Sequence, residues 1–162
     1  MTGTLSAPGG VLAFNAPTGL KRLFAEFFGR NALAALPGTQ PVAGATVKLI
    51  QIDSTNQQVG ADIATAVTAA DGTFTLTVPA SFVPGPQFVI RAIGTVNLER
   101  LVTDFSSQDV NPATQVTKQL VLAQLAGGNI QNLPRLQVLA VAGQVAALVH
   151  DIAPSLTAGA MV

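Results

Sequence analysis

Threonines alternate with apolar side chains from Thr73 to Val78, the clearest hydrophobic pattern in the chain. A period of two places Phe74, Leu76 and Val78 on one face of an extended segment and the threonines on the other. Asp71-Gly72, just before it, is a turn signal, because glycine reaches positive φ without penalty and aspartate accepts hydrogen bonds from nearby backbone. We therefore predict a strand over 73–78 with its three apolar side chains buried.

Further short apolar segments lie between turn signals on both sides of this strand. Turns are expected at Asp53–Asn56 and at Pro84–Pro86. The segment Phe88–Ile93 is apolar on both faces, which predicts a central strand. The predicted strands cover 42–52, 58–67, 87–93 and 95–103. Their spacing is typical of an antiparallel β-sandwich, so the predicted fold class is mainly β. A short apolar piece at 11–14 is a candidate first or edge strand.

Helical spacing appears at both ends of the chain. Between Thr18, a suitable N-cap, and Pro37-Gly38, a stop signal, apolar side chains form one stripe, so we predict an amphipathic helix over 19–36. Asn111-Pro112 predicts the start of a second helix, which ends at Gly127-Gly128. A third helix is predicted over 134–149; because it is apolar nearly all round, we expect it to be buried on more than one side.

The length of 162 residues favours a single domain. Within it we expect an N-terminal strand and helix over 1–40, the β-sandwich over 41–108 and a helical extension over 109–162.

The charge content changes the interpretation of the surface. Charged residues make up 10% of the chain, against roughly 25% in an average soluble domain. Apolar residues make up 49%, and the mean hydropathy is +0.49. Either much of the surface is buried against copies of the chain or another partner, or the surface is rich in uncharged polar residues.

Several functional classes lack support in the composition. The net charge of zero argues against binding to nucleic acid, which requires a basic surface. The chain has no cysteine, and it has no apolar run long enough to span a bilayer. The first residues lack the pattern of a secretory leader, so we expect either a cytoplasmic chain or one whose leader was removed.

No catalytic, cofactor-binding or metal-binding residue is predicted. The chain has a single histidine, His150, and no Gly-x-Ser-x-Gly motif that would supply a serine nucleophile for it. The side chain of the adjacent Asp151 would point away from His150 on a helix, so the two would not form a catalytic pair. Asp104 and Asp109 share one loop and could bind Ca²⁺ with backbone carbonyls, but turn and capping roles are favoured.

The helical stripes supply the candidate contact residues. The first stripe could cover the chain's own core or dock onto a neighbouring subunit. It could also lie on a membrane surface with Lys21, Arg22 and Arg30 at the headgroups, although only three basic residues make membrane contact the least favoured of these. The candidate self-association residues are Leu20, Phe24, Phe27 and Phe28 in the first helix and Leu136, Leu139, Val145 and Leu148 in the last.

Residues 41–103 resemble the carboxypeptidase regulatory-like family, which has a transthyretin-like (prealbumin-like) sandwich and occurs in bacterial secreted and surface proteins. The resemblance rests on three motifs: Gly44-Ala45-x-Val47-x-Leu49, Thr68-x-x-Asp71-Gly72-x-Phe74-x-Leu76-x-Val78-Pro79, and Phe88-Val89-Ile90-Arg91-Ala92. Ala69 stands where the family often has an acidic residue. The helix opening Asn111-Pro112-x-Thr114 is similar to a segment that follows this domain in some bacterial lipoproteins. The resemblance implies a seven-stranded structural, adhesive or folding-assisting module, and it supplies no catalytic residues.

These observations predict a non-enzymatic structural subunit of a self-assembling extracellular or cell-surface structure, such as a filament, whose partners are copies of itself. The alternative is a monomeric secreted or lipid-anchored module that binds a small ligand or carbohydrate. The absence of tryptophan and tyrosine does not favour a small-molecule ligand.

Overall fold

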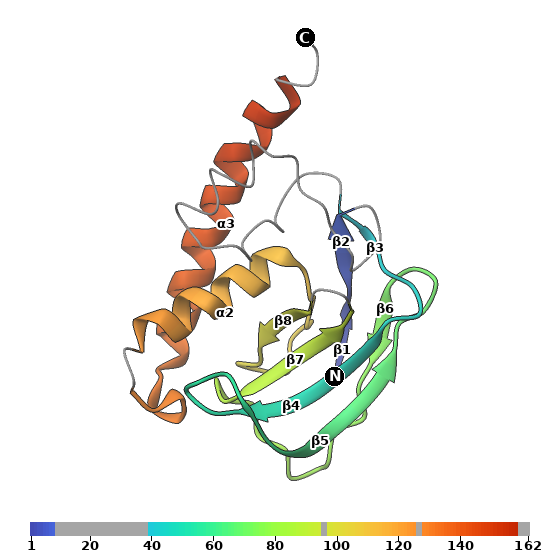
Figure 1. Ribbon diagram of the computed structural model, residues 1–162, viewed down its shortest axis with the longest axis vertical. Helices are drawn as coiled ribbons and strands as arrows, with labels where there is room; N and C mark the ends of the chain where they lie inside the picture. The colour runs from blue at the N-terminus through green and yellow to red at the C-terminus, as the bar shows by residue number, and fades with distance from the viewer. Residues whose placement is uncertain (9–38, 95–96, 126–127, 159–162) are drawn as a thin grey trace.

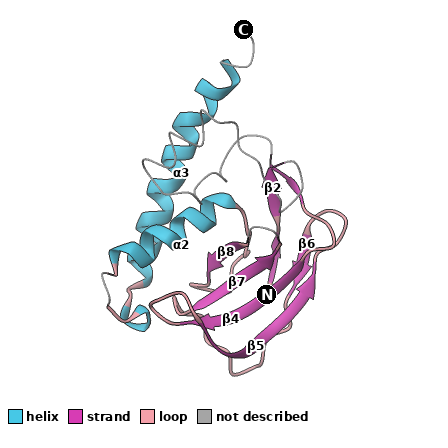
Figure 2. Ribbon diagram, viewed as in Figure 1, coloured by secondary structure: helices cyan, strands magenta, loops and turns pink. Residues whose placement is uncertain are grey.

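The computed structural model describes residues 1–8, 39–94, 97–125 and 128–158, with side chains described only as far as residue 147. The described chain consists mainly of strands in antiparallel sheets, followed by two helices (Figures 1 and 2). The predicted helix over 19–36 and the candidate strand over 11–14 lie outside the described residues.

A four-stranded antiparallel sheet forms the centre of the molecule. Its strands are β4 (Thr46–Ile52), β5 (Gln58–Val67), β7 (Phe88–Ile93) and β8 (Leu98–Leu101), in the order β5-β4-β7-β8. β5 has the predicted bounds, whereas β4, β7 and β8 are shorter than predicted. The central position of β7 is confirmed, because β7 pairs with β4 on one side and β8 on the other.

Two short ribbons lie beside this sheet. β1 (Thr2–Thr4) pairs with β6 (Thr73–Thr75), and β2 (Ser6–Pro8) pairs with β3 (Thr39–Pro41). β6 ends earlier than predicted, although backbone pairing continues to Leu76, whose N–H donates to the carbonyl of Met1 over 2.8 Å. β1, β2 and β3 were not predicted.

Residues 1–8 join segments that are far apart in the sequence. The N–H of Leu5 donates to the carbonyl of Gly72 over 2.8 Å, and the carbonyl of Leu5 accepts from Val42 over 3.0 Å. On the other side, Val110 donates to Thr4 over 2.7 Å, and Ser6 donates to Val110 over 3.0 Å. This N-terminal segment therefore fills a slot between residues 41–76 and residues 108–110.

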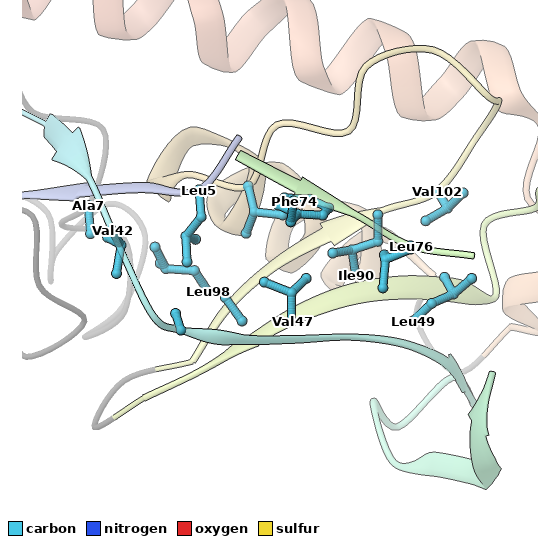
Figure 3. Packing of buried hydrophobic residues seen from close by; sticks show 13 residues of the cluster. Leu5, Ala7, Val42, Val47, Leu49, Phe74, Leu76, Ile90, Leu98 and Val102 are labelled. Carbon is cyan, nitrogen blue, oxygen red and sulfur yellow. The ribbon is translucent and has the colours of Figure 1, made fainter. Parts of the chain in front are cut away.

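The first hydrophobic core lies between the four-stranded sheet and the ribbons (Figure 3). Phe74 and Leu76 are buried, Val78 is half-buried against them, and the threonines between them are exposed, which confirms the predicted alternation. Full burial of one such side chain contributes about 1.5–3 kcal/mol. The sheet supplies Val47, Leu49, Ile90 and Ala92 to this core.

The predicted turns are also present. Asp71 Oδ1 accepts from the N–H and hydroxyl of Thr73, over 3.0 and 2.7 Å, and Gly72 has a φ of 77°. The hydroxyl of Thr73, followed by its N–H, lowers the pKa of Asp71. Asp53 closes its turn in the same way, accepting from Thr55 and Gln57.

Two helices cover part of the opposite face of the sheet. α2 (Pro112–Gln124) begins as predicted: Asn111 Oδ1 accepts from the N–H of Thr114, and Thr114 Oγ1 accepts from the N–H of Asn111, each over 3.1 Å. A short 3₁₀ turn, η1 (Ile130–Asn132), leads to α3 (Arg135–Ala158), which is longer than predicted at its C-terminal end.

The second core lies under these helices. Ile50, Ile52, Val89 and Leu101 of the sheet meet apolar side chains of both helices. α3 contributes Val138, Val141 and Val145, at helical spacing, so a single stripe of its described side chains is buried. Among the described residues, the chain itself therefore buries only one side of this helix, and burial of a second side stays a prediction.

Candidate functional site

The side of α3 opposite its buried stripe is exposed and almost free of charge. We call Leu136, Ala140, Gly143 and Ala147 the α3 outer face; they follow one another at intervals of three or four residues, so they form one stripe. Leu136 is 78% exposed. A Cβ atom at Gly143 would meet none of the described residues within 4 Å, so their packing does not require glycine there. Figure 2 shows α3 extending past the strands at its C-terminal end.

The structure separates the predicted self-association residues. Leu136 and Leu139 are exposed and suit contact with another chain. Val145 is buried in the second core of its own chain, so it is not available for such a contact. Leu20, Phe24, Phe27 and Phe28, as well as the side chain of Leu148, lie outside the described residues.

The β5 edge is a second surface that could accept a partner. Among the described strands, β5 pairs only with β4, so the backbone groups of its other edge have no strand partner. Natural edge strands are usually blunted by lysine, proline or short length. β5 has ten residues, neither of these residue types, and a single charged side chain, Asp62, which pairs with Lys48 over 2.7 Å. A bulge interrupts β5, because its pairing with β4 jumps from Gln51↔Val59 to Leu49↔Ala64 and Gly60 has a φ of 77°. Only the regular stretch from residue 64 to 67 therefore lacks the usual protection against strand addition.

A short apolar row adjoins this edge. Thr46 of β4 lies between Val67 of β5 and Ile93 of β7, on the face of the sheet that the helices cover farther along. Val67 is 62% and Ile93 is 40% exposed. This end of the sheet thus exposes apolar side chains next to an unpaired edge.

A buried charge cluster connects α2 to the sheet. The Glu99 carboxylate accepts hydrogen bonds from Lys118 Nζ and Arg91 Nε, and Lys118 Nζ also donates to Asn56 Oδ1 over 2.9 Å. Lys118 is only 2% exposed. Burial lowers the pKa of Lys118 because it disfavours the charged form, and Glu99 partly offsets this. With Lys118 and Glu99 buried at its centre, the cluster acts as a structural tie between β7, β8, α2 and the turn after β4.

Sequence reasoning missed this cluster. The available signal was Lys118 itself, which is the one charged residue in α2 and lies one turn after Thr114 and one turn before Val121. A lone lysine on the packed side of a helix requires a buried partner, because an unpaired buried charge is unfavourable by several kcal/mol.

The two aspartates considered for Ca²⁺ already have protein partners. Asp104 accepts from the N–H of Ser106 over 2.9 Å and pairs with Arg135 over 2.5 Å. Asp109 Oδ1 accepts from the N–H and hydroxyl of Thr4, over 3.0 and 2.7 Å. Burial raises the pKa of Asp109, but the Thr4 hydrogen bonds outweigh it and leave a net lowering. Both carboxylates therefore stabilise the loop that contains them. The described residues contain no group of three or more potential metal ligands.

Two further findings concern the chain as a whole. Within the described ranges, no helix is both long and apolar enough to cross a membrane. Comparison of the chain with models of known protein families, with curated proteins and with solved structures gave no significant match.

Proposed function

We propose that this chain is a non-enzymatic structural subunit that assembles with copies of itself, and that its fold is a transthyretin-like β-sandwich. The observation that carries the proposal is the α3 outer face, an uncharged helical stripe with small side chains. Small residues let two helix backbones approach closely, and the leucine at one end supplies apolar area for burial.

The β5 edge supplies a second, different contact. A helix stripe that pairs with itself across a two-fold axis gives only a dimer. A subunit with two independent surfaces, one helical and one a sheet edge, can continue beyond two copies. The combination supports a filament or another extended assembly.

The sandwich assignment is supported by the first core, which has strands on two sides. Val47 and Ile90 of the four-stranded sheet and Leu5 and Phe74 of the ribbon side belong to one buried cluster. The resemblance of residues 41–103 to the carboxypeptidase regulatory-like family agrees with this assignment. That resemblance alone supports our further proposal of an extracellular or cell-surface location.

Light scattering tests the assembly. We expect the particle mass of the wild-type chain to rise with concentration above the 16.5 kDa of one chain. Leu136→Glu/Ala140→Glu places two carboxylates in the proposed contact, where burying an unpaired charge is unfavourable by several kcal/mol. Because the β5 edge remains, this variant should form nothing larger than a dimer, with an unchanged circular dichroism spectrum.

The matched control adds the same charge elsewhere. Ala80 and Val83 are exposed on the segment between β6 and β7. Ala80→Glu/Val83→Glu should assemble like the wild type. A wild-type chain that remains monomeric at high concentration would exclude the proposal, and a Leu136→Glu/Ala140→Glu variant that assembles normally would exclude the α3 outer face.

The alternative function is a monomeric module that binds a small ligand. One observation favours it: a groove between β8 and the two helices is lined by Arg100, a cation with no carboxylate partner among the described residues.

A further inference from the structure

A groove lies where β8, α2 and α3 meet, and its cavity measures about 80 Å³. A water molecule needs roughly 10–15 Å³ on this scale, so the cavity has room for a short organic group. Arg100, Leu101 and Thr103 line one side, and Thr114 of α2 lines another. Val138 and Leu139 of α3 supply an apolar wall.

Arg100 differs from the other cationic side chains of the described residues. Lys48, Arg91, Lys118 and Arg135 each have a carboxylate partner in a salt bridge, whereas Arg100 has none. Its Nη1 donates to the backbone carbonyl of Asp109 over 3.1 Å, and its Nε is buried without a hydrogen-bond partner. A buried donor left unpaired is unfavourable by about 1–3 kcal/mol.

The electrostatic environment keeps this guanidinium charged but poorly solvated. Burial lowers the pKa of Arg100, and the more distant Asp109 and Asp104 partly offset the effect. An arginine remains protonated under such conditions. Arg100 leaves β8 on the side of its register partner Ile90, and its Nε has no accessible surface, so Arg100 supplies the β8 rim of the groove with a positive charge but not with this donor.

The outer edge of β8 adds backbone donors to the same groove. Val102 donates to the carbonyl of Phe88 over 2.9 Å, and antiparallel pairing alternates, so the backbone groups of Glu99 and Leu101 point away from β7. The carbonyl of Glu99 accepts from the hydroxyl of Thr114 over 3.3 Å, as this geometry requires. The N–H of Leu101 is directed toward the same edge.

We propose that this groove binds a small carboxylate with a short aliphatic chain. The carboxylate lies against the guanidinium of Arg100, which is suited to planar two-oxygen recognition. The aliphatic part contacts Val138 and Leu139. An inorganic anion would not remove this apolar wall from water, and a cation would be repelled by the charge of Arg100. The inference goes beyond the proposed assembly and does not depend on it.

Amide NMR titration of the full chain tests this site with propionate as the probe. We expect saturable shifts of the Leu101 and Thr114 amides, and none of similar size with propionamide or sulfate. Arg100→Gln should weaken propionate binding about tenfold or more, which corresponds to about 1.4 kcal/mol or more. Arg135→Gln is the matched control, because this exposed arginine pairs with Asp104 and does not line the groove.

A second variant guards against loss of folding in Arg100→Gln. Leu139→Phe should fill the cavity and abolish the shifts while Arg100 stays in place. Three results would overturn the proposal: no saturable shift up to about 50 mM propionate, where a Kd of order 1 mM would saturate; equal shifts with propionamide or sulfate; or equal weakening by Arg100→Gln and Arg135→Gln.

Discussion

Two glycines have opposite surroundings in this molecule. A Cβ atom on Gly3 would lie 2.3 Å from the backbone oxygen of Gln108 and 2.8 Å from Cζ of Phe74. Real Cβ atoms do not approach backbone so closely, and the backbone of residue 108 cannot move aside like a flexible side chain. Gly143, on the α3 outer face, has open space instead.

We expect Gly3→Ala to lower the free energy of unfolding by about 1–3 kcal/mol, because overpacking forces the backbone to shift. Gly143→Ala should raise it by up to about 1 kcal/mol, since alanine is the better helix former and meets no neighbour. Urea unfolding of both variants measures the difference. A Gly3→Ala variant as stable as the wild type would contradict the close approach of β1 to residue 108.

At the scale of elements, the sequence predicts those strands, turns and helix caps that are determined by residues close together in the chain. The β5 bounds, the Asp71-Gly72 turn and the Asn111 cap follow from short patterns with a local physical cause. β1, β2 and β3 were missed because each has three residues and exists only through distant partners. α3 continues beyond 149 and through Pro154, a residue that ordinarily favours an earlier end.

The candidate sites also fall into two groups, those predicted from local spacing and those formed only by the tertiary fold. The exposed positions Leu136 and Leu139 were found because a helix that is apolar all round must leave some apolar side chains outside its core. The groove beside Arg100 and the identity of the partners of Lys118 could not be found, because each site brings together side chains from three or more elements. Their pairing depends on the tertiary fold rather than on spacing in the sequence.

The buried cluster predicts an unequal response to two similar substitutions. Glu99→Gln leaves Lys118 with a neutral partner in a sealed site, so we expect a loss of about 3–5 kcal/mol in the free energy of unfolding. Asp62→Asn breaks the partly exposed pair with Lys48 and should lower stability by about 1 kcal/mol or less. Chemical denaturation of both variants gives the comparison.

A second substitution shows whether the loss comes from the unpaired charge. Lys118→Met in the Glu99→Gln background removes that charge, and it should restore part of the stability, with a coupling of about 0.5–3 kcal/mol. Equal losses for Glu99→Gln and Asp62→Asn would show that the cluster is not a structural tie.

For the whole molecule, the aspartates determine the response to acid. Hydrogen bonds from Lys48 lower the pKa of Asp62 below its ordinary value of 3.8, and those from Ser106 do the same for Asp104. The unfolded chain therefore binds more protons than the folded chain as the pH falls through this range. The stability that these groups contribute is present above about pH 4 and is lost below it.

We expect the urea midpoint to be nearly constant from about pH 6 to 5 and to fall steadily from about pH 4 to 2.5. Asp62→Asn should make the decline shallower, because it removes one of the groups whose pKa is lowered. A midpoint that does not change down to pH 2.5 would contradict these shifts.

The slot filled by residues 1–8 has a consequence for the order of folding. Thr4 bonds to Asp109, 105 residues later. At roughly 5–20 residues per second, a ribosome needs about 5–20 s to make the intervening chain. During this time Leu5, which is fully buried in the finished molecule, has only part of its final surroundings. Contacts over such separations also slow folding, because the chain loses the entropy of loop closure before the contact can stabilise it. Residues 1–8 leave the ribosome well before Asp109 and are therefore among the last described residues to complete their contacts.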